Sequence, residues 1–289
     1  MEIEILHQRW LLDVPEAVAE TFGDWLCAHG ATATYRAAEP PFLFYAYFPP
    51  GQALPDPAGL AAFPGVRLVQ SETFADEDWL AKSREGFGPI EVGRGFFIRP
   101  LWEDCPVPAG RTPIVVNPGL AFGTGGHETT RLCMALVEDL AAQGALADPV
   151  LDIGAGTGIL ALTAWLRGAR EITAFDHDPD CGPAMVDFME LNAALLGGAR
   201  PFSHFVGELE DPRVDGPYRT VLANILLETI QDLLPRMAVI TAPGGLLVAS
   251  GILAERQDEA LVSLAAYGFM PLRVVQEGAW IAILARRQP

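Results

Sequence analysis

The chain has 289 residues, half of them hydrophobic and 19% charged, which is enough apolar material for one large domain or two modest ones. No apolar run reaches the roughly 18 residues that a membrane span needs, and a formal net charge of −18, with a single lysine, repels nucleic-acid backbones. The four cysteines are widely spaced and form no CxxC pair, which disfavours a zinc site or a disulfide framework.

The N-terminus, Met1-Glu-Ile-Glu-Ile, lacks the basic and apolar regions of a signal peptide. We therefore expect a cytoplasmic, monomeric protein with no bound metal, no membrane contact and no direct nucleic-acid binding. An acidic field of this size would attract a basic partner at low salt. Solubility alone accounts for the charge equally well.

Residues 1–70 are predicted to form a small α+β domain of the ferredoxin-like type, because their elements follow the order βαββαβ. The acidic stretch 71–85 that follows is predicted to be a linker helix. The expected elements of the small domain are strands at 2–12, 32–36, 42–48 and 66–70, a helix from Asp13 to about His29, and a short helix near Leu60.

Residues 86–289 are predicted to form a second, α/β domain. Short strand-like pieces lie between Phe96 and Asn117, and a glycine-rich loop then leads into a helix from Glu128 to about Gln143. The loop contains an apolar Leu-Ala-Phe segment, and the hydroxyls of Thr129 and Thr130 stand at the helix start. A loop that folds over a bound ligand has this composition.

The remaining chain alternates between strands and helices, which predicts a parallel sheet covered on both faces. A terminal hairpin, 269–276 with 279–286, favours a methyltransferase-type sheet over a plain dinucleotide-binding sheet, by analogy alone. The expected strands are 150–153, 172–176, 202–206, 220–224 and 244–251, and the expected helices are 159–166, 180–196, 228–240 and 255–267.

The stretch Val150-Leu-Asp-Ile-Gly-Ala-Gly-Thr-Gly-Ile-Leu is predicted to be a strand, a glycine turn and a helix. Gly154, Gly156 and Gly158 leave the turn bare, so a ligand is expected to lie against backbone N–H groups at the helix N-terminus. Asp176 ends the next strand, where a carboxylate can accept both hydroxyls of a ribose. A nucleoside-containing cofactor is therefore expected.

Two cofactors fit the glycine pattern. The three glycines match the G-x-G-x-G turn of S-adenosylmethionine enzymes, whereas Gly156, Gly158 and Ala161 match the G-x-G-x-x-A pattern of NAD enzymes. The glycine-rich loop before the first strand of the sheet and Asn224 at the end of the fourth favour S-adenosylmethionine. Dinucleotide-binding folds begin at their first strand and have no use for a preceding lid.

Four motifs occur in order: Asn-Pro-Gly-Leu-Ala-Phe-Gly-Thr-Gly-Gly-His-Glu-Thr-Thr, Leu-Asp-Ile-Gly-Ala-Gly-Thr-Gly-Ile-Leu-Ala, Phe-Asp-His-Asp-Pro and Ala-Asn-Ile-Leu. From about Trp79 to the C-terminus the chain thereby resembles the bacterial family that methylates protein eleven of the large ribosomal subunit (protein methyltransferase A). The resemblance implies a class I, Rossmann-like methyltransferase fold that uses S-adenosylmethionine and releases S-adenosylhomocysteine. It also implies that the small N-terminal domain captures a basic ribosomal protein, whose lysine and N-terminal amines are methylated.

Carried over from the family, the cofactor contacts fall on Thr130, Gly154, Asp176 and Asn224, to which the glycine pattern adds Gly156 and Gly158. Asn224 is expected to be catalytic, its side-chain oxygen orienting the acceptor amine. This chain departs from the family at Gly-His-Glu, where many members have Thr-His-Pro, and at an unusual Cys-Gly-Pro that opens the helix after Asp180.

Two other functions stay open: a protein-lysine methyltransferase with another target, and an NAD-dependent oxidoreductase. His127 is left out of the catalytic set because loop histidines are often incidental. Trp280, in the terminal hairpin, is expected to belong to the core.

Overall fold

The computed structural model describes residues 6–15, 18–31, 33–36, 43–75, 88–117, 125–197 and 202–289. The chain divides into two units, Met1–Gly86 and Phe87–Pro289. Among the residues that the structure describes, no helix has the length and apolarity needed to cross a bilayer.

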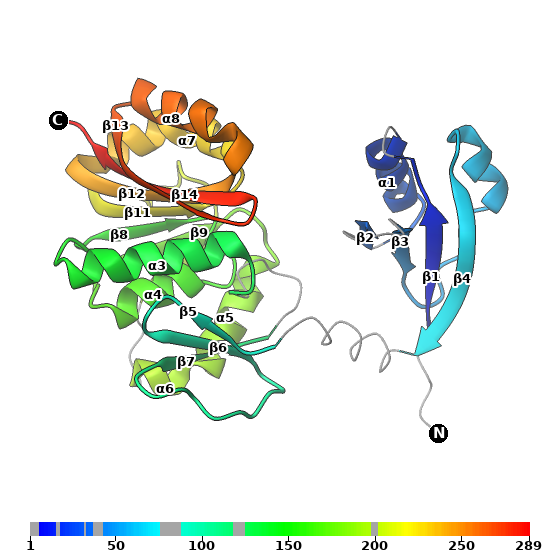
Figure 1. The fold of residues 1–289 in the computed structure, drawn as a ribbon, viewed down its shortest axis with the longest axis horizontal. Coiled ribbons are helices and arrows are strands. Elements are labelled where there is room, and N and C mark those ends of the chain that lie inside the picture. Colours follow the sequence, from blue (N-terminus) through cyan, green and yellow to red (C-terminus); the bar gives the residue numbers. More distant parts are fainter. Residues whose placement is uncertain are drawn as a thin grey trace. The chain divides into compact units, whose positions relative to one another are not determined.

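The first unit is an antiparallel sheet in the order β2-β3-β1-β4 (Figure 1). Trp10, Phe44 and Phe48 on one face of the sheet pack with Phe22 of the first helix into one apolar core. The expected order of elements is found, except that the second helix is a 3-10 helix. The elements are β1 (Leu6–Asp13), α1 (Ala19–Ala28), β2 (Ala33–Arg36), β3 (Leu43–Phe48), η2 (Pro57–Ala62) and β4 (Arg67–Ala75).

Strand β4 continues past the boundary expected from the sequence. The linker helix was predicted to begin at Ser71, but Ser71–Ala75 remain strand because β1 offers pairing partners as far as Leu6, which lies opposite Ala75. A polar, acidic sequence can form an edge strand when a neighbour satisfies its backbone groups. The remainder of the predicted linker, 76–85, lies outside the described residues.

The second unit opens with a three-stranded sheet in the order β5-β6-β7, formed by β5 (Ile90–Val92), β6 (Phe96–Pro100) and β7 (Thr112–Val116). The buried carboxylate of Glu138 ties this sheet to two helices. It accepts hydrogen bonds from the backbone N–H of Arg94 (2.7 Å) and from Nη2 of Arg167 (2.6 Å), and the Arg167 guanidinium lies over the ring of Phe96.

A seven-stranded sheet in the order β10-β9-β8-β11-β12-β14-β13 forms the centre of the second unit. The first five strands are parallel, and β14 pairs antiparallel to both β12 and β13. Its elements are α3 (Glu128–Ala142), β8 (Val150–Ile153), α4 (Ile159–Leu166), β9 (Ile172–Asp176), α5 (Cys181–Leu191), α6 (Ala193–Leu196), β10 (Ser203–Val206), β11 (Tyr218–Asn224), α7 (Leu227–Ile240), β12 (Thr241–Leu253), η3 (Ala254–Arg256), α8 (Gln257–Ala266), β13 (Phe269–Glu277) and β14 (Trp280–Arg287).

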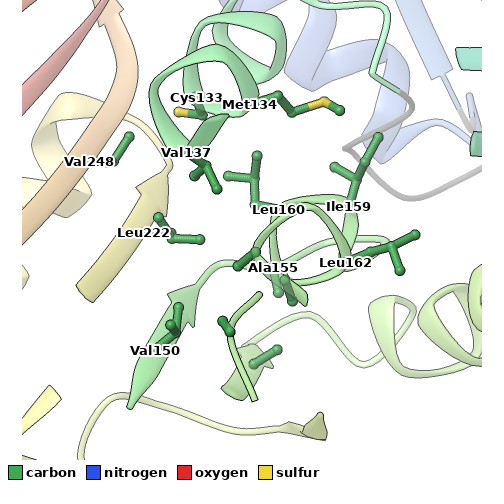
Figure 2. Packing of buried hydrophobic residues seen from close by; sticks show 14 of the residues in the cluster. Cys133, Met134, Val137, Val150, Ala155, Ile159, Leu160, Leu162, Leu222 and Val248 are labelled. Carbon is green, nitrogen blue, oxygen red and sulfur yellow. The ribbon is translucent and has the colours of Figure 1, made fainter. Parts of the chain in front are cut away.

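Both faces of this sheet are buried, as the alternation of strands and helices predicts. Val150 faces a core shared with α3, α4 and α5, whereas its neighbour Leu151 faces a second core shared with α7 and α8 (Figure 1). Figure 2 shows Leu222 and Val248 of two strands pointing at Val137 of α3. Helices on both faces leave the carboxyl edge of the sheet open for a ligand.

The helix predicted over 180–196 is interrupted at Asn192. This buried side chain pairs with the backbone of Val115 in β7, where its Oδ1 accepts from the N–H (2.9 Å) and its Nδ2 donates to the carbonyl (2.8 Å). α5 therefore ends at Leu191, and α6 begins at Ala193. An asparagine that bonds to distant backbone competes with the helical bonds of its own segment.

Candidate active site

A cavity of about 610 Å³ lies at the carboxyl ends of the parallel strands. In the order β10-β9-β8-β11-β12, the direction in which successive strands are added reverses between β8 and β11. Such a reversal leaves a crevice in which α/β sheets bind their ligands. Residues at or just after the strand ends line the cavity: Gly154, Gly156, Asp176, Glu208, Asn224 and Gly251.

Four backbone N–H groups in and after the glycine turn bond within the protein. Gly156 donates to Oδ2 of Asp176 (2.8 Å), and Ala155 to the carbonyl of Phe175 (3.0 Å). Gly158 donates to Ala155, and Ala161 to Asp152. These four bonds therefore fix the shape of the turn.

Two of the three glycines of the turn line the cavity, and the third does not. Gly154 and Gly156 line the cavity in left-handed conformations, with φ of 64° and 55°, which a glycine adopts without strain. Gly158 lies outside the cavity walls and is the left-handed N-cap of α4, where a Cβ would crowd Met185. Of the three predicted cofactor residues in the turn, two face the cavity.

Asp176 ends β9 with its carboxylate against the cavity, and only 8% of the residue is exposed. Oδ2 accepts the N–H of Gly156, and Oδ1 accepts the N–H of Asp178 at 3.0 Å. These bonds orient the carboxylate, whose Oδ1 also lies 3.5 Å from Nδ1 of His177 and which the Cys181 thiol contacts. Each carboxylate oxygen can accept more than one hydrogen bond. The carboxylate is therefore fixed at the cavity wall.

Asp152 lies behind the turn and is fully buried. Burial, with a smaller contribution from the charge of Asp176, raises its pKa to about 7, against the opposing effect of the Ala161 N–H, which bonds to Oδ2 at 2.9 Å. This aspartate joins β8 to the start of α4. It shapes the turn from behind rather than from the cavity side.

Asn224 ends β11 on the opposite side of the strand reversal. Its Nδ2 donates to Oγ1 of Thr130 at 3.2 Å, and its Oδ1 is buried without a hydrogen-bond partner among the residues that the structure describes. A buried acceptor left unpaired costs about 1–3 kcal/mol, so this oxygen is suited to a donor brought by a ligand. Thr130 is itself buried and outside the cavity walls, so its hydroxyl holds Asn224 in place.

Ile225, directly after Asn224, is held between two glycines from neighbouring strands. A Cβ at Gly154 would overlap the Ile225 side chain, and a Cβ at Gly251, where φ is 87°, would overlap the Ile225 carbonyl. The N–H of Ile225 also donates to the carbonyl of Ser250 (3.1 Å). Sequence reasoning missed Gly251, whose only sequence signal is a glycine near the end of a predicted apolar strand.

His127 and Trp280 both line the cavity, although neither was expected in the site. Their rings meet edge to face with centroids 5.1 Å apart, and His127 also caps α3 by accepting the N–H of Thr129. The expectation that Trp280 belongs to the core is wrong, because β14 begins at the carboxyl edge of the sheet. Residues 118–124 of the predicted ligand loop lie outside the described residues.

Arg131 fastens the start of α3 to the terminal hairpin. Its Nε and Nη2 donate to Oε1 of Glu277 at 3.0 and 2.6 Å, and its Nη1 donates to the carbonyl of Gly126. The hairpin turn thereby becomes one wall of the cavity. The sequence signal was an arginine one turn into a helix, which by itself indicates no partner.

Comparisons of the sequence and the structure with known proteins point to one protein family. The family model described as Ribosomal protein L11 methyltransferase (PrmA) matches residues 60–288, which is most of the chain. The chain belongs to the ribosomal protein L11 methyltransferase family. It is 39% identical over 246 residues to the ribosomal protein L11 methyltransferase of Trichlorobacter lovleyi, covering 80% of this chain and 75% of that protein.

A second member of the family, the ribosomal protein L11 methyltransferase of Desulfatibacillum aliphaticivorans, is 37% identical over 211 residues, which are 73% of this chain and 67% of that protein. The crystal structure of ribosomal protein L11 methylase from Lactobacillus delbrueckii subsp. bulgaricus superposes with a TM-score of 0.60. It is 31% identical and covers 70% of this chain and 100% of that chain. The α/β sheet of the second unit is thus that of the S-adenosylmethionine-dependent, class I methyltransferases.

Family membership decides between the two cofactors expected from the glycine pattern. The alternative of an NAD-dependent oxidoreductase is wrong, and the sheet agrees, since antiparallel β14 lies between β12 and β13. Dinucleotide-binding sheets continue with a parallel strand at this position. The L11 methyltransferase family therefore accounts for the terminal hairpin as well as for the motifs.

Proposed function

We propose that this enzyme transfers methyl groups from S-adenosylmethionine to aliphatic amines, both lysine side chains and the N-terminal amine, of ribosomal protein L11. The observation that carries the proposal is that Asn224 lines the cavity at the strand reversal and that its buried Oδ1 has no hydrogen-bond partner among the described residues. An acceptor in that position is complementary to an N–H donor on the substrate.

The residues of the cavity fit the cofactor. Asp176 would accept the ribose hydroxyls, and Gly154 and Gly156 would let the cofactor approach the backbone, with the buried Leu209 as an apolar wall for the base. When bound, S-adenosylmethionine supplies a methyl group on a positively charged sulfur. Thr130 would act through Asn224, as a positioning residue.

The acceptor must present a lone pair, and positioning is the main task of the protein. A lysine of pKa ~10.4 loses its proton at pH 7 at a cost of about 4.6 kcal/mol, and an α-amine of pKa ~7.8 at about 1 kcal/mol. A partly apolar cavity lowers either pKa by desolvation. Asn224 Oδ1 would accept one amine hydrogen and thereby aim the lone pair.

The residues after Asn224 favour an aliphatic amine. They are Ile-Leu-Leu, without the proline-rich aromatic platform of related enzymes that methylate flat amides and bases. The excess of acidic over basic residues, 37 to 19, favours encounter with a basic ribosomal protein at low salt, in the cytoplasm where that protein is made. A relative acting on another protein would keep the same chemistry.

Mass spectrometry of purified L11 incubated with enzyme and S-adenosylmethionine tests the proposal. We expect mass increments of about 14 Da per methyl group. The rate of transfer to lysine should rise about tenfold per pH unit between pH 7 and 8, where the lysine is mostly protonated. Asn224→Ala should abolish most of the transfer. S-adenosylhomocysteine binding without any methylation of L11 would overturn the proposed acceptor.

A further inference from the structure

Helix α7 begins at the cavity, and its N-cap is a leucine. Leu226 has 62% of its surface exposed and lines the cavity, and its side chain makes no capping hydrogen bond. Ser, Thr, Asp and Asn are preferred at this position, and an apolar residue there costs about 1 kcal/mol. Neither the helix start nor the apolar core therefore accounts for a leucine at this place.

A hydrophobic staple does not account for it either. In that arrangement the residue before the N-cap packs against the fourth helical residue. Those positions are Ile225 and Ile230, and both pack in the core on this face of the sheet. The side chain of Leu226 is directed to the cavity instead.

Leu226 continues along α7 as a stripe that lines the cavity. Thr229 and Leu233 follow at spacings of three and seven residues and share its face of the helix. The stripe starts two residues after Asn224, whose Oδ1 has no partner within the described part of the chain. Apart from the hydroxyl of Thr229, the wall is therefore apolar, and it ends at Asn224.

Contacts of the intervening residue fix the position of Leu226 relative to Asn224. The intervening residue, Ile225, is bonded to Ser250 and enclosed by Gly154 and Gly251. An occupant of this part of the cavity meets a surface that these contacts hold in place. The complementary group is a flexible apolar chain with an N–H donor at its tip, which is the chemistry of a lysine side chain.

We propose that Leu226 contacts the methylene stem of the acceptor lysine and so determines specificity for a long aliphatic amine. The assignment rests on the proposed function, because it concerns the acceptor of that reaction. The contact exists before and during methyl transfer, so it stabilises the bound substrate and the transition state equally. Its loss raises KM for the protein acceptor and leaves kcat unchanged.

The test compares Leu226→Ser with Val239→Ser, using transfer of a radiolabelled methyl group to L11. Val239 lies on the same helix and is 70% exposed, but it does not line the cavity. Val239→Ser is therefore a control that removes exposed apolar surface from α7 away from the site. We expect KM for L11 to rise about tenfold in Leu226→Ser alone. Leu226→Met, which conserves volume, should restore it.

Affinity for S-adenosylhomocysteine should stay unchanged in all three variants. The melting temperature should fall in none of them and should rise in Leu226→Ser, because serine is a preferred N-cap. Equal KM values for Leu226→Ser and Val239→Ser would overturn the assignment, and so would a fall in kcat or in cofactor affinity as large as the rise in KM. If the unaltered enzyme bound S-adenosylhomocysteine but did not methylate L11, the proposed function would fail and this assignment with it. The activity of the unaltered enzyme thus separates the two failures.

Discussion

The amide nitrogen of Asn224 donates to the hydroxyl of Thr130 across 3.2 Å, joining residues 94 positions apart in the chain. Thr130 belongs to the first turn of α3, and Asn224 is the last residue of β11. With Nδ2 held in this way, Oδ1 is directed away from Thr130 and bonds to none of the residues that the structure describes. One threonine thereby orients the acceptor on which the proposed chemistry depends.

Removing this hydroxyl while keeping the shape of the side chain should impair turnover more than cofactor binding. Thr130→Val leaves Nδ2 of Asn224 buried without a partner, which costs about 1–3 kcal/mol and frees the amide to rotate. We expect kcat to fall about tenfold or more. Thr130→Ser retains the hydroxyl and should stay near the unaltered rate, as steady-state kinetics would measure. A normal kcat in Thr130→Val would contradict the positioning role.

Replacing Asp176 should weaken cofactor binding. Hydrogen bonds to a charged group contribute about 1.5–3 kcal/mol each, so Asp176→Ala is expected to raise the Kd for S-adenosylhomocysteine about 100-fold or more. Calorimetric titration measures this, and Asp187→Ala, on an exposed part of α5, serves as the control. Because Asp176 also anchors Gly156 and Asp178, folding of the variant must be checked by circular dichroism. An unchanged Kd in folded protein would refute the ribose-binding role.

Gly251 should not tolerate a side chain, because a Cβ there overlaps the carbonyl of Ile225. Gly251→Ala would displace the Asn224–Ile225 segment, and a shift of about 1 Å can lower kcat about 100-fold. Gly244 of the same strand is the matched control: it too has a positive φ, of 78°, but its Cβ would meet nothing within 4 Å. Gly244→Ala should lose about 1–2 kcal/mol of stability and keep its kcat. Similar kcat losses in both variants would point to general destabilisation.

Asp152 should make the protein less stable as the pH rises. Burial raises its pKa to about 7, from about 3.9 in the unfolded chain, so the folded state binds the additional proton between these values. The free energy of unfolding therefore decreases as pH rises from about 4 to about 7. Asp152→Asn can still accept the N–H of Ala161 but cannot titrate.

Urea unfolding at pH 5 and pH 7.5 tests this contribution of Asp152. Between these pH values the unaltered protein should lose about 1–3 kcal/mol relative to Asp152→Asn. Taking the difference between the two proteins removes the contributions of all other carboxylates. Parallel pH dependences would show that Asp152 is ionised throughout.

The order of elements was largely determined by the sequence alone. Apolar strands alternating with amphipathic helices predicted the parallel sheet, and the carboxyl ends of parallel strands lie at one edge. Gly154, Asp176 and Asn224 were therefore predicted to meet because each ends, or directly follows, a predicted strand. The terminal hairpin and the family motifs were also predicted from the sequence, because each is a pattern of residues that are close together in the chain.

Only the tertiary structure decided how these residues are used. The glycine turn bonds to Asp176 and Asp152, Thr130 supports Asn224, Gly251 makes room for Ile225, and Trp280 lines the cavity. Asp152 and Ala161 are 9 residues apart in the chain, and His127 and Trp280, whose rings meet at the cavity, are 153 residues apart. Such contacts leave no periodic signal in the sequence, because they depend on which strands become neighbours and on the space between side chains once the sheet has formed.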